Sequence, residues 1–313
     1  MKSKEGSIIG GSLLVAGTAI GGGMLALPVV TGIAGFWPSV AICIACWLCM
    51  LCTGLLYVEV CLTSCKGDNI VSLAKKTLGR KGQVVAWGVY LFFFYSLVTA
   101  YVDEGGRFFY LTFNEVISKP IATLLFVSLF GVVVFLGTRF VDRINKLLMF
   151  GLISSFLVFI VYGAKHVQSD YLSHVSWSGG IYSLPIMFAS FGFQGIIPSL
   201  TNYLNFSKKK LVWSVVLGAT LPLIIYIIWL WLILGIVPLK GPYGIIEAYK
   251  QGHSAILPLK AHLNNTSLNW IGQAFAFFAL VSSFIGVTLG LVDFLSDGLK
   301  IAKKGRQHIG LCM

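Results

Sequence analysis

Two apolar stretches of the chain contain residue types that could bind a small charged molecule inside a membrane. They are "AGTAIGGGMLALP" (16–28) and "FASFGFQGIIPSL" (188–200), and each combines glycines with a proline, which an uninterrupted helix would avoid. In hydrocarbon every backbone N–H and C=O group needs a partner, so a broken helix persists only where the freed groups line a cavity or hold a ligand. Both stretches are therefore candidate binding sites.

The chemistry of the first break suits a molecule with two opposite charges. Gly21, Gly22 and Gly23 would begin an outer half-helix, whose unpaired amides and dipole favour a carboxylate. The carbonyl groups of Ala19 and Ser190 could accept hydrogen bonds from an ammonium group, so a zwitterionic amino acid fits. The alternative is that glycines only let helices pack closely. This alternative suits the neighbouring Gly6, Gly10, Gly11 and Gly17.

Composition places the two breaks in an integral membrane protein. Of 313 residues, 57% are hydrophobic and 11% are charged, too few charges to cover a soluble globule of this size. The net charge of +12 comes from short Lys and Arg clusters between apolar runs, not from one basic face. We therefore expect no nucleic-acid partner, and we interpret the clusters as markers of membrane topology.

A transmembrane helix needs about 20 mostly apolar residues, and this criterion predicts an all-α protein with eight spans. The predicted spans are 7–31, 36–64, 83–113, 120–138, 146–163, 180–203, 211–237 and 268–299. Alternate connections carry most of the Lys and Arg residues, which predicts that both termini are cytoplasmic. We expect the protein to lie in the inner (plasma) membrane. Segment 69–79 is either a short surface helix or a basic loop, and 244–250 is a possible short outer helix.

Other chemistry-bearing residues are few. Cys43, Cys46, Cys49 and Cys52 repeat at every third position of one apolar run, which indicates small packing residues on one helix face and not a metal site. The chain has no HExxH or GxSxG motif, so we expect neither an enzyme nor a cofactor. No segment resembles a channel filter.

Acidic residues in the third span have two interpretations. If the span ends at Tyr101, Asp103 and Glu104 lie in a solvated loop. If it continues to Phe113, the helix is tilted and both carboxylates face an outer vestibule. In that case either could be proton-sensitive, although an ion pair with Arg107 one helical turn away would explain them equally well.

The breaks are about 170 residues apart, each is followed by a proline, and they lie in spans that run in opposite directions. This arrangement predicts an inverted repeat, with residues 1–165 (spans 1–5) as the first repeat and 178–313 (spans 6–8) as an incomplete second repeat, all within one membrane domain.

With "GLVDFLSDGL" (290–299), the two break segments resemble the hydroxy and aromatic amino acid permeases, most closely the tyrosine and tryptophan branch, over essentially the whole chain. The resemblance implies a five-plus-five inverted-repeat fold, an aromatic amino acid substrate and proton symport. It also implies two groups of substrate-binding residues. These are Thr18, Ala19, Ile20, Gly21, Gly22 and Gly23 in span 1, and Phe188, Ala189, Ser190, Phe191, Gly192 and Gln194 in span 6.

An aromatic substrate also needs ring partners and, for tyrosine, a polar group near its hydroxyl. Ring candidates are Phe188, Phe191 and Phe193, and hydroxyl candidates are Gln194, Thr99 and Ser283. We expect secondary active transport of L-tyrosine into the cytoplasm, driven by the proton gradient. Alternatives are a tryptophan-preferring permease and a transport-inactive remnant, because the resemblance implies about eleven spans and this chain reads as C-terminally truncated after the eighth.

Overall fold

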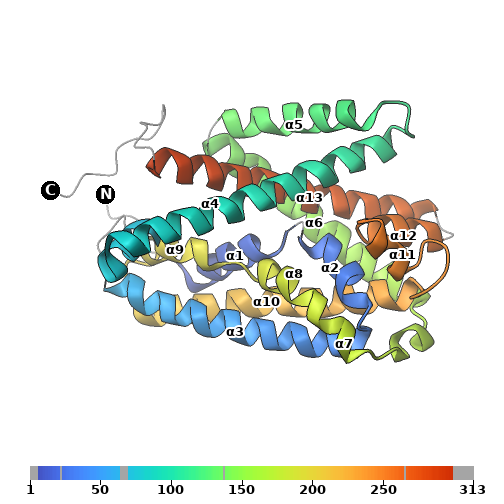
Figure 1. Cartoon of the computed structure of the whole chain (residues 1–313), viewed down its shortest axis with the longest axis horizontal. Helices are drawn as coiled ribbons and strands as arrows, with labels where there is room; N and C mark the ends of the chain where they lie inside the picture. Colours follow the sequence, from blue (N-terminus) through green and yellow to red (C-terminus); the bar gives the residue numbers. More distant parts are fainter. Residues whose placement is uncertain (1–5, 22, 64–69, 137, 264–265, 299–313) are drawn as a thin grey trace. The chain divides into compact units, whose positions relative to one another are not determined.

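The computed structural model describes residues 6–21, 23–63, 70–136, 138–263 and 266–298. Within these ranges all regular structure is helical, and no strand occurs (Figure 1). The all-helical prediction is therefore confirmed for the described part of the chain. The chain divides into two compact units: unit 1 comprises Met1–Gln83 and Phe150–Ala279, and unit 2 comprises Val84–Met149 and Leu280–Met313.

Six helical segments in the described ranges are long and apolar enough to cross a membrane. They are Phe36–Leu62, Ile70–Thr112, Arg143–His166, Trp177–Tyr203, Lys208–Ile236 and Trp270–Val292. Helices α1 (Ile8–Ala19) and α2 (Gly23–Gly32), bent by 58°, would together form a seventh. Helix α5 (Lys119–Phe135) is apolar but has 17 residues, fewer than the about 20 that a bilayer normally requires. The chain is thus a multi-pass membrane protein.

Unit 1 contains both break segments and the helices that pack around them. Its complete elements are α1, α2, α3 (Phe36–Leu62), η1 (Ala164–His166), η2 (Ser169–Ser173), α7 (Trp177–Gly180), η3 (Ile181–Ser183), α8 (Leu184–Ser190), η4 (Gln194–Ile196), α9 (Ile197–Tyr203), α10 (Lys208–Ile236), α11 (Ile245–Lys250) and α12 (Ile256–His262). It also includes parts of α4 (Ile70–Thr112), α6 (Thr138–Gly163) and α13 (Thr266–Gly298).

Helix α10 packs directly along α1 because small residues line the contact. A Cβ added to Gly11 would lie 2.5 Å from Ser214 Oγ, and one added to Gly218 would lie 2.5 Å from Val15 Cβ. The hydroxyl of Ser214 donates to the carbonyl of Ile8 (3.1 Å). At Gly11 the close-packing explanation for a glycine is therefore confirmed.

A buried apolar cluster joins α1, α3, the first part of α4, α9 and α10 within unit 1, together with Phe193 and Leu204 of the connecting segments. Its members are Val15, Val58, Cys61, Leu73, Phe193, Ile197, Leu200, Leu204, Leu211, Val215 and Ala219. Phe193 lies in the second break and packs against Gly54, where an added Cβ would lie 2.6 Å from the ring. This cluster fixes one side of the second break against the adjacent helices.

Unit 2 has an aromatic core built from α4, α5 and α13. The fully buried ring of Phe126 lies 5.1 Å from Phe284 and 5.6 Å from Phe109, measured between centroids. Gly105 and Gly106 remain helical in α4 because their missing side chains leave room for Phe126 and Thr123. Helix α4 continues to Thr112, so the longer of the two predicted third spans is confirmed.

Two short helices predicted in connecting segments are present. Residues 70–78 are helical, and Gly79 then interrupts α4 with φ 70° and ψ −165°, a conformation that glycine adopts easily. The loop alternative for this segment is therefore wrong, whereas its position on the inner membrane surface stays a prediction. Between α10 and α12, α11 covers 245–250.

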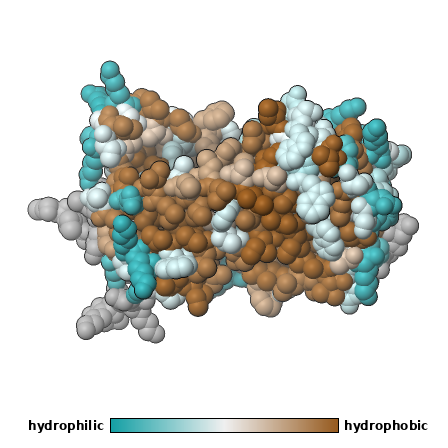
Figure 2. Space-filling model, turned by 90° about the horizontal axis from the view of Figure 1, so that it is seen from below, coloured by the Kyte–Doolittle hydropathy of each residue, from teal (hydrophilic) through white to brown (hydrophobic). Residues whose placement is uncertain are grey.

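The surface of the face that includes α3 matches a membrane environment. Figure 2 shows this face with hydrophobic residues across its middle and hydrophilic residues gathered at both ends. Large side chains of α3 contribute to the apolar area, among them Trp37, Leu48 and Leu56, which are 62%, 48% and 64% exposed. An apolar middle between polar ends suits helices that face hydrocarbon.

Candidate functional site

The first break separates α1 from α2. Helix α1 ends at Ala19, Ile20 adopts an extended conformation (φ −73°, ψ 104°), and α2 begins at Gly23. The amide of Met24 donates to the carbonyl of Gly21 (3.0 Å). Gly22, the middle of the predicted break, lies outside the described residues. The predicted interruption of the first span is therefore present.

Pro28 leaves one carbonyl near this break without its usual helical partner. In α2 the carbonyl of Met24 would accept from the amide of residue 28, but Pro28 has no N–H group. The indole of Trp229 in α10 supplies the missing donor, with Nε1 2.8 Å from the Met24 oxygen. Trp229 is 1% exposed, so this bond is shielded from water.

The second break lies between α8 and α9. Helix α8 ends at Ser190, residues 191–193 leave the helical path, and η4 leads into α9. Pro198 is in the first turn of α9, where a missing amide removes no helical bond. The amide of Ile197 donates to the carbonyl of Gln194, which closes the turn locally. Both predicted breaks are thus present in unit 1.

One side chain joins the two breaks. The hydroxyl of Tyr226, in the middle of α10, lies 2.7 Å from the carbonyl oxygen of Ala19 and 2.9 Å from that of Ser190. The two carbonyls that the sequence suggested as ammonium acceptors therefore lie within two hydrogen-bond lengths of each other. Tyr226 is fully buried, and its ring meets Phe191 edge-on at 5.2 Å.

The side chain of Ser190 faces the start of α2. Its Oγ is buried and has no hydrogen-bond partner among the described residues. A Cβ added to Gly23 would lie 3.0 Å from this oxygen, so glycine leaves the hydroxyl uncovered by a side chain at position 23. A buried polar atom without a partner costs free energy, and a ligand that bonds to the Ser190 hydroxyl would remove that cost.

The arrangement offers complementary partners to a zwitterion. The C-terminal ends of α1 and α8 present carbonyl oxygens with partial negative charge, which favour a cation. The N-terminal end of α2 has the opposite polarity and lies beside the Ser190 hydroxyl, so it favours an anion. Acceptors for an ammonium group and donors for a carboxylate are therefore close together.

Comparison with known proteins gives the family. The sequence matches the tryptophan/tyrosine permease family over residues 4–313. The chain belongs to this permease family. It is therefore a transporter and not an enzyme, as the absence of catalytic motifs predicted.

Three relatives are similar to this permease over most of their length. It is 32% identical to tyrosine-specific transport system 1 of Haemophilus influenzae, over 97% of this chain and 77% of the relative. It is 36% identical to a tryptophan-specific transport protein of Shigella flexneri (93% and 72%) and 34% identical to the low affinity tryptophan permease of Escherichia coli K12 (95% and 75%). The resemblance inferred from the break segments is thus confirmed at family level.

The remaining predicted residues of the permease breaks differ in exposure. Thr18, Phe188 and Ala189 are exposed, and the Thr18 hydroxyl donates to the carbonyl of Val15 (2.7 Å). Ile20 and Phe191 are buried, whereas Gly21, Gly23, Gly192 and Gln194 are half-buried. The amide of Gln194 points toward α3, with Nε2 3.3 Å from the carbonyl of Met50. Of the predicted substrate-binding residues, the structure thus brings Ala19, Gly23 and Ser190 close together.

Four predicted residues of the permease belong to unit 2 and not to the unit that contains the breaks. These are Thr99, Asp103, Glu104 and Ser283. Asp103 forms ion pairs with Lys119 (2.8 Å) and Arg107 (3.5 Å), so the predicted pairing with Arg107 is confirmed. Thr99 is exposed, while Glu104 and Ser283 are half-buried.

Sequence reasoning missed Tyr226 and Trp229. Both lie in an otherwise apolar span, and a buried tyrosine or tryptophan in hydrocarbon needs a partner for its polar atom. Pro28 supplied a second signal, because it leaves the Met24 carbonyl without an amide donor. Combining these two signals would have pointed to α10.

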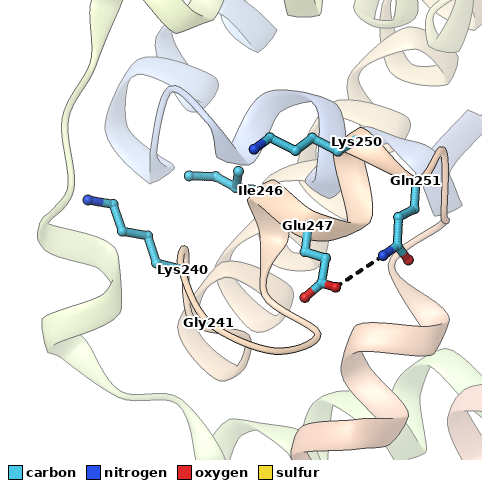
Figure 3. A pocket seen from close by; sticks show the side chains of 6 residues that line it. All are labelled: Lys240, Gly241, Ile246, Glu247, Lys250 and Gln251. Atoms are coloured by element: carbon cyan, nitrogen blue, oxygen red, sulfur yellow. Dashed lines mark hydrogen bonds between the residues drawn. The ribbon is translucent and has the colours of Figure 1, made fainter.

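A hollow in the segment between α10 and α12 includes no residue of the two breaks. Figure 3 shows it lined by Lys240, Gly241, Ile246, Glu247, Lys250 and Gln251, from α11 and the segments beside it. The carboxylate of Glu247 accepts bonds from the Gln251 amide and the Tyr243 backbone, both at 3.0 Å. The carboxylate of Glu247 is therefore already hydrogen-bonded. In the described ranges no group of three or more His, Cys, Asp or Glu residues could hold a metal ion.

Proposed function

We propose that this permease carries an aromatic amino acid, L-tyrosine first, across the inner (plasma) membrane into the cytoplasm together with a proton. The observation that carries the proposal is the convergence of the Ala19 and Ser190 carbonyls on one point, beside the start of α2. The family and the names of its relatives support an aromatic amino acid as the substrate class.

The proposed binding mode assigns each charged end of the substrate to one group of backbone atoms. The ammonium group binds the carbonyls of Ala19 and Ser190, which end two helices. The carboxylate binds amides at the start of α2 and the Ser190 hydroxyl, the buried group that has no partner among the described residues. The substrate ring would then lie along exposed residues of the second break, including Phe188.

Tryptophan is the alternative substrate, and the two possibilities differ in one requirement. Relatives named for tyrosine and for tryptophan have similar identity to this chain, 32% and 36%. A tyrosine site needs a polar partner for the phenolic hydroxyl, and such a site discriminates strongly against analogues that lack the group. Of the candidates from the sequence, Gln194 points its amide toward α3, and Thr99 and Ser283 belong to unit 2. A transport-inactive form of the permease is the third possibility.

The proposed transport cycle rests on an inverted repeat. Spans 1 and 6 would be equivalent members of residues 1–165 and 178–313, with eight spans in all and both termini in the cytoplasm. Broken helices at corresponding positions support this arrangement, as does the basic character of alternate connections. In such folds one group of helices moves against another around a fixed site.

The substrate experiment compares two glycines. Gly23→Val places a branched side chain against Ser190, so we expect uptake of labelled tyrosine to fall at least about tenfold. Gly131→Val is the matched control, because no described atom lies within 4 Å of a Cβ added there. Each variant is quantified in the membrane, and competition with unlabelled tryptophan and phenylalanine ranks the substrates. Equal uptake by the two variants would contradict a site at the breaks.

The coupling experiment compares two acids of unit 2. Asp103 is held by two cations, whereas Glu104 is half-buried, so Glu104→Gln and Asp103→Asn separate an ion-pair role from a proton-carrying role. Loss of the proton gradient should abolish accumulation of tyrosine in the unmodified protein. The variant that loses accumulation but keeps tyrosine exchange identifies the proton-sensitive acid. Accumulation that survives collapse of the gradient would exclude proton symport.

A further inference from the structure

We propose that Tyr226 is a positioning residue, which holds the two carbonyl groups in place for the substrate's ammonium group. The inference rests on the proposed function of the two breaks and adds a residue of a third segment, α10, to the site. It is based on one buried hydroxyl that contacts the last residue of α1 and the last residue of α8.

The two carbonyl groups need a donor to remain close to each other. Each ends a helix, where the last C=O groups lack intrahelical partners and carry the negative end of the helix dipole. Without a proton between them, the buried carbonyl oxygens of Ala19 and Ser190 would repel each other. The phenolic O–H of Tyr226 supplies that proton.

The position of the hydroxyl is itself fixed. Tyr226 is fully buried in the middle of α10, and its ring packs edge-on against Phe191. Trp229, three residues later on α10, donates to the carbonyl of Met24 at the start of α2. Helix α10 therefore holds both sides of the first break as well as the end of α8.

Tyr226 leaves hydrogen-bonding capacity for a ligand. A hydroxyl has one proton, whereas each carbonyl oxygen has two lone pairs, so both oxygens can still accept from a second donor. An ammonium group has three protons and can use these sites while the hydroxyl remains in place. The tyrosine thus sets the spacing of the acceptors and does not replace the ligand.

The test removes only the hydroxyl. Tyr226→Phe keeps the ring contact with Phe191 but leaves two buried carbonyls without this donor, so we expect KM for tyrosine uptake to rise about tenfold with Vmax changed less than about threefold. Tyr249→Phe, on the exposed side of α11, is the matched control and should keep both constants. An unchanged KM for Tyr226→Phe, with any fall confined to Vmax or to the amount of protein, would overturn the proposal.

A second variant restores the donor. Replacement of Tyr226 by para-aminophenylalanine keeps an N–H group at the same end of the ring, so KM should return to within about threefold of that of the unmodified protein. This variant also answers the question if Tyr226→Phe does not accumulate in membranes, since a tenfold higher KM with a donor present would overturn the proposal. If the unmodified chain neither binds nor transports tyrosine, the proposed function fails first and the role of Tyr226 falls with it.

Discussion

The two breaks both have a proline shortly after the interruption, but the missing amide has different consequences. Pro28 lies inside α2 and leaves the carbonyl of Met24 without its helical donor, which Trp229 of α10 replaces. Pro198 lies in the first turn of α9, where the amide has no helical partner to lose. The first break therefore depends on a distant helix, whereas the turn of the second is closed by its own backbone.

The two breaks also differ in which of their polar atoms have a hydrogen-bond partner. At the first break, the carbonyls of Ala19 and Met24 both receive a bond from α10. At the second break, the Ser190 hydroxyl stays buried with no partner among the described residues. Helix α10 also donates to the Ser190 carbonyl through Tyr226, so α10 supports both breaks and most strongly the first. We infer that the second break contributes an unused polar atom, the Ser190 hydroxyl, for the ligand. Three predictions address this contrast.

The largest effect is expected where the first break depends on α10. Trp229→Phe leaves the Met24 carbonyl buried without its donor and reduces side-chain volume, so we expect a loss of about 2–3 kcal/mol in the free energy of unfolding. In the Pro28→Ala background an amide becomes available to Met24, and the same substitution should cost at least about 1 kcal/mol less. Thermal unfolding of the four proteins in detergent measures this cycle. Additive effects would show that Trp229 does not compensate for Pro28.

At the second break we expect a smaller change in the free energy of unfolding, and of opposite sign. Ser190→Ala removes a buried hydroxyl without a partner, so the ligand-free protein should be as stable as before or more stable by about 1 kcal/mol, while KM for tyrosine rises. Ser39→Ala is the matched control, because the Ser39 hydroxyl bonds to the carbonyls of Thr31 (2.8 Å) and Gly35 (2.6 Å) and its loss should destabilise. Destabilisation by both substitutions, with no change in KM, would contradict a ligand role for Ser190.

The smallest effect is expected at Gln194. Its amide makes only long contacts with α3, 3.3 Å to the Met50 carbonyl and 3.5 Å to the Thr53 hydroxyl. Gln194→Leu should therefore change the free energy of unfolding by less than about 1 kcal/mol. Because the side chain points toward α3, we also expect the ratio of tyrosine to tryptophan uptake to stay the same. A tenfold change in that ratio would make Gln194 a specificity residue after all.

The sequence was most informative where local chemistry alone decides the backbone. Three consecutive glycines and Pro28 predicted the first interruption, and Gly192 with Pro198 predicted the second, because these residues weaken a helix whatever packs around them. The length of α4 was harder to predict. Gly105 and Gly106 resemble a helix end, yet the helix continues because Phe126 and Thr123 fill the space beside them.

Long-range partners could not be predicted in the same way. Tyr226 and Trp229 lie in a span whose other residues are nearly all apolar. The carbonyls of Ala19 and Met24, to which they donate, are about 200 positions away in the sequence. Asp103 was paired correctly with Arg107, one helical turn away, but its shorter contact is with Lys119 of the next helix. Helical spacing predicts the contact with Arg107, whereas only tertiary packing determines the contact with Lys119.

The bond from Trp229 to Met24 also has an evolutionary consequence. A proline at position 28 is tolerated only while some other group donates to the carbonyl that it strands, so positions 28 and 229 should change together among descendants of this chain. A lineage that loses the indole first would be under pressure to lose the proline next. Drift at one position is thereby restricted by a residue two hundred places away.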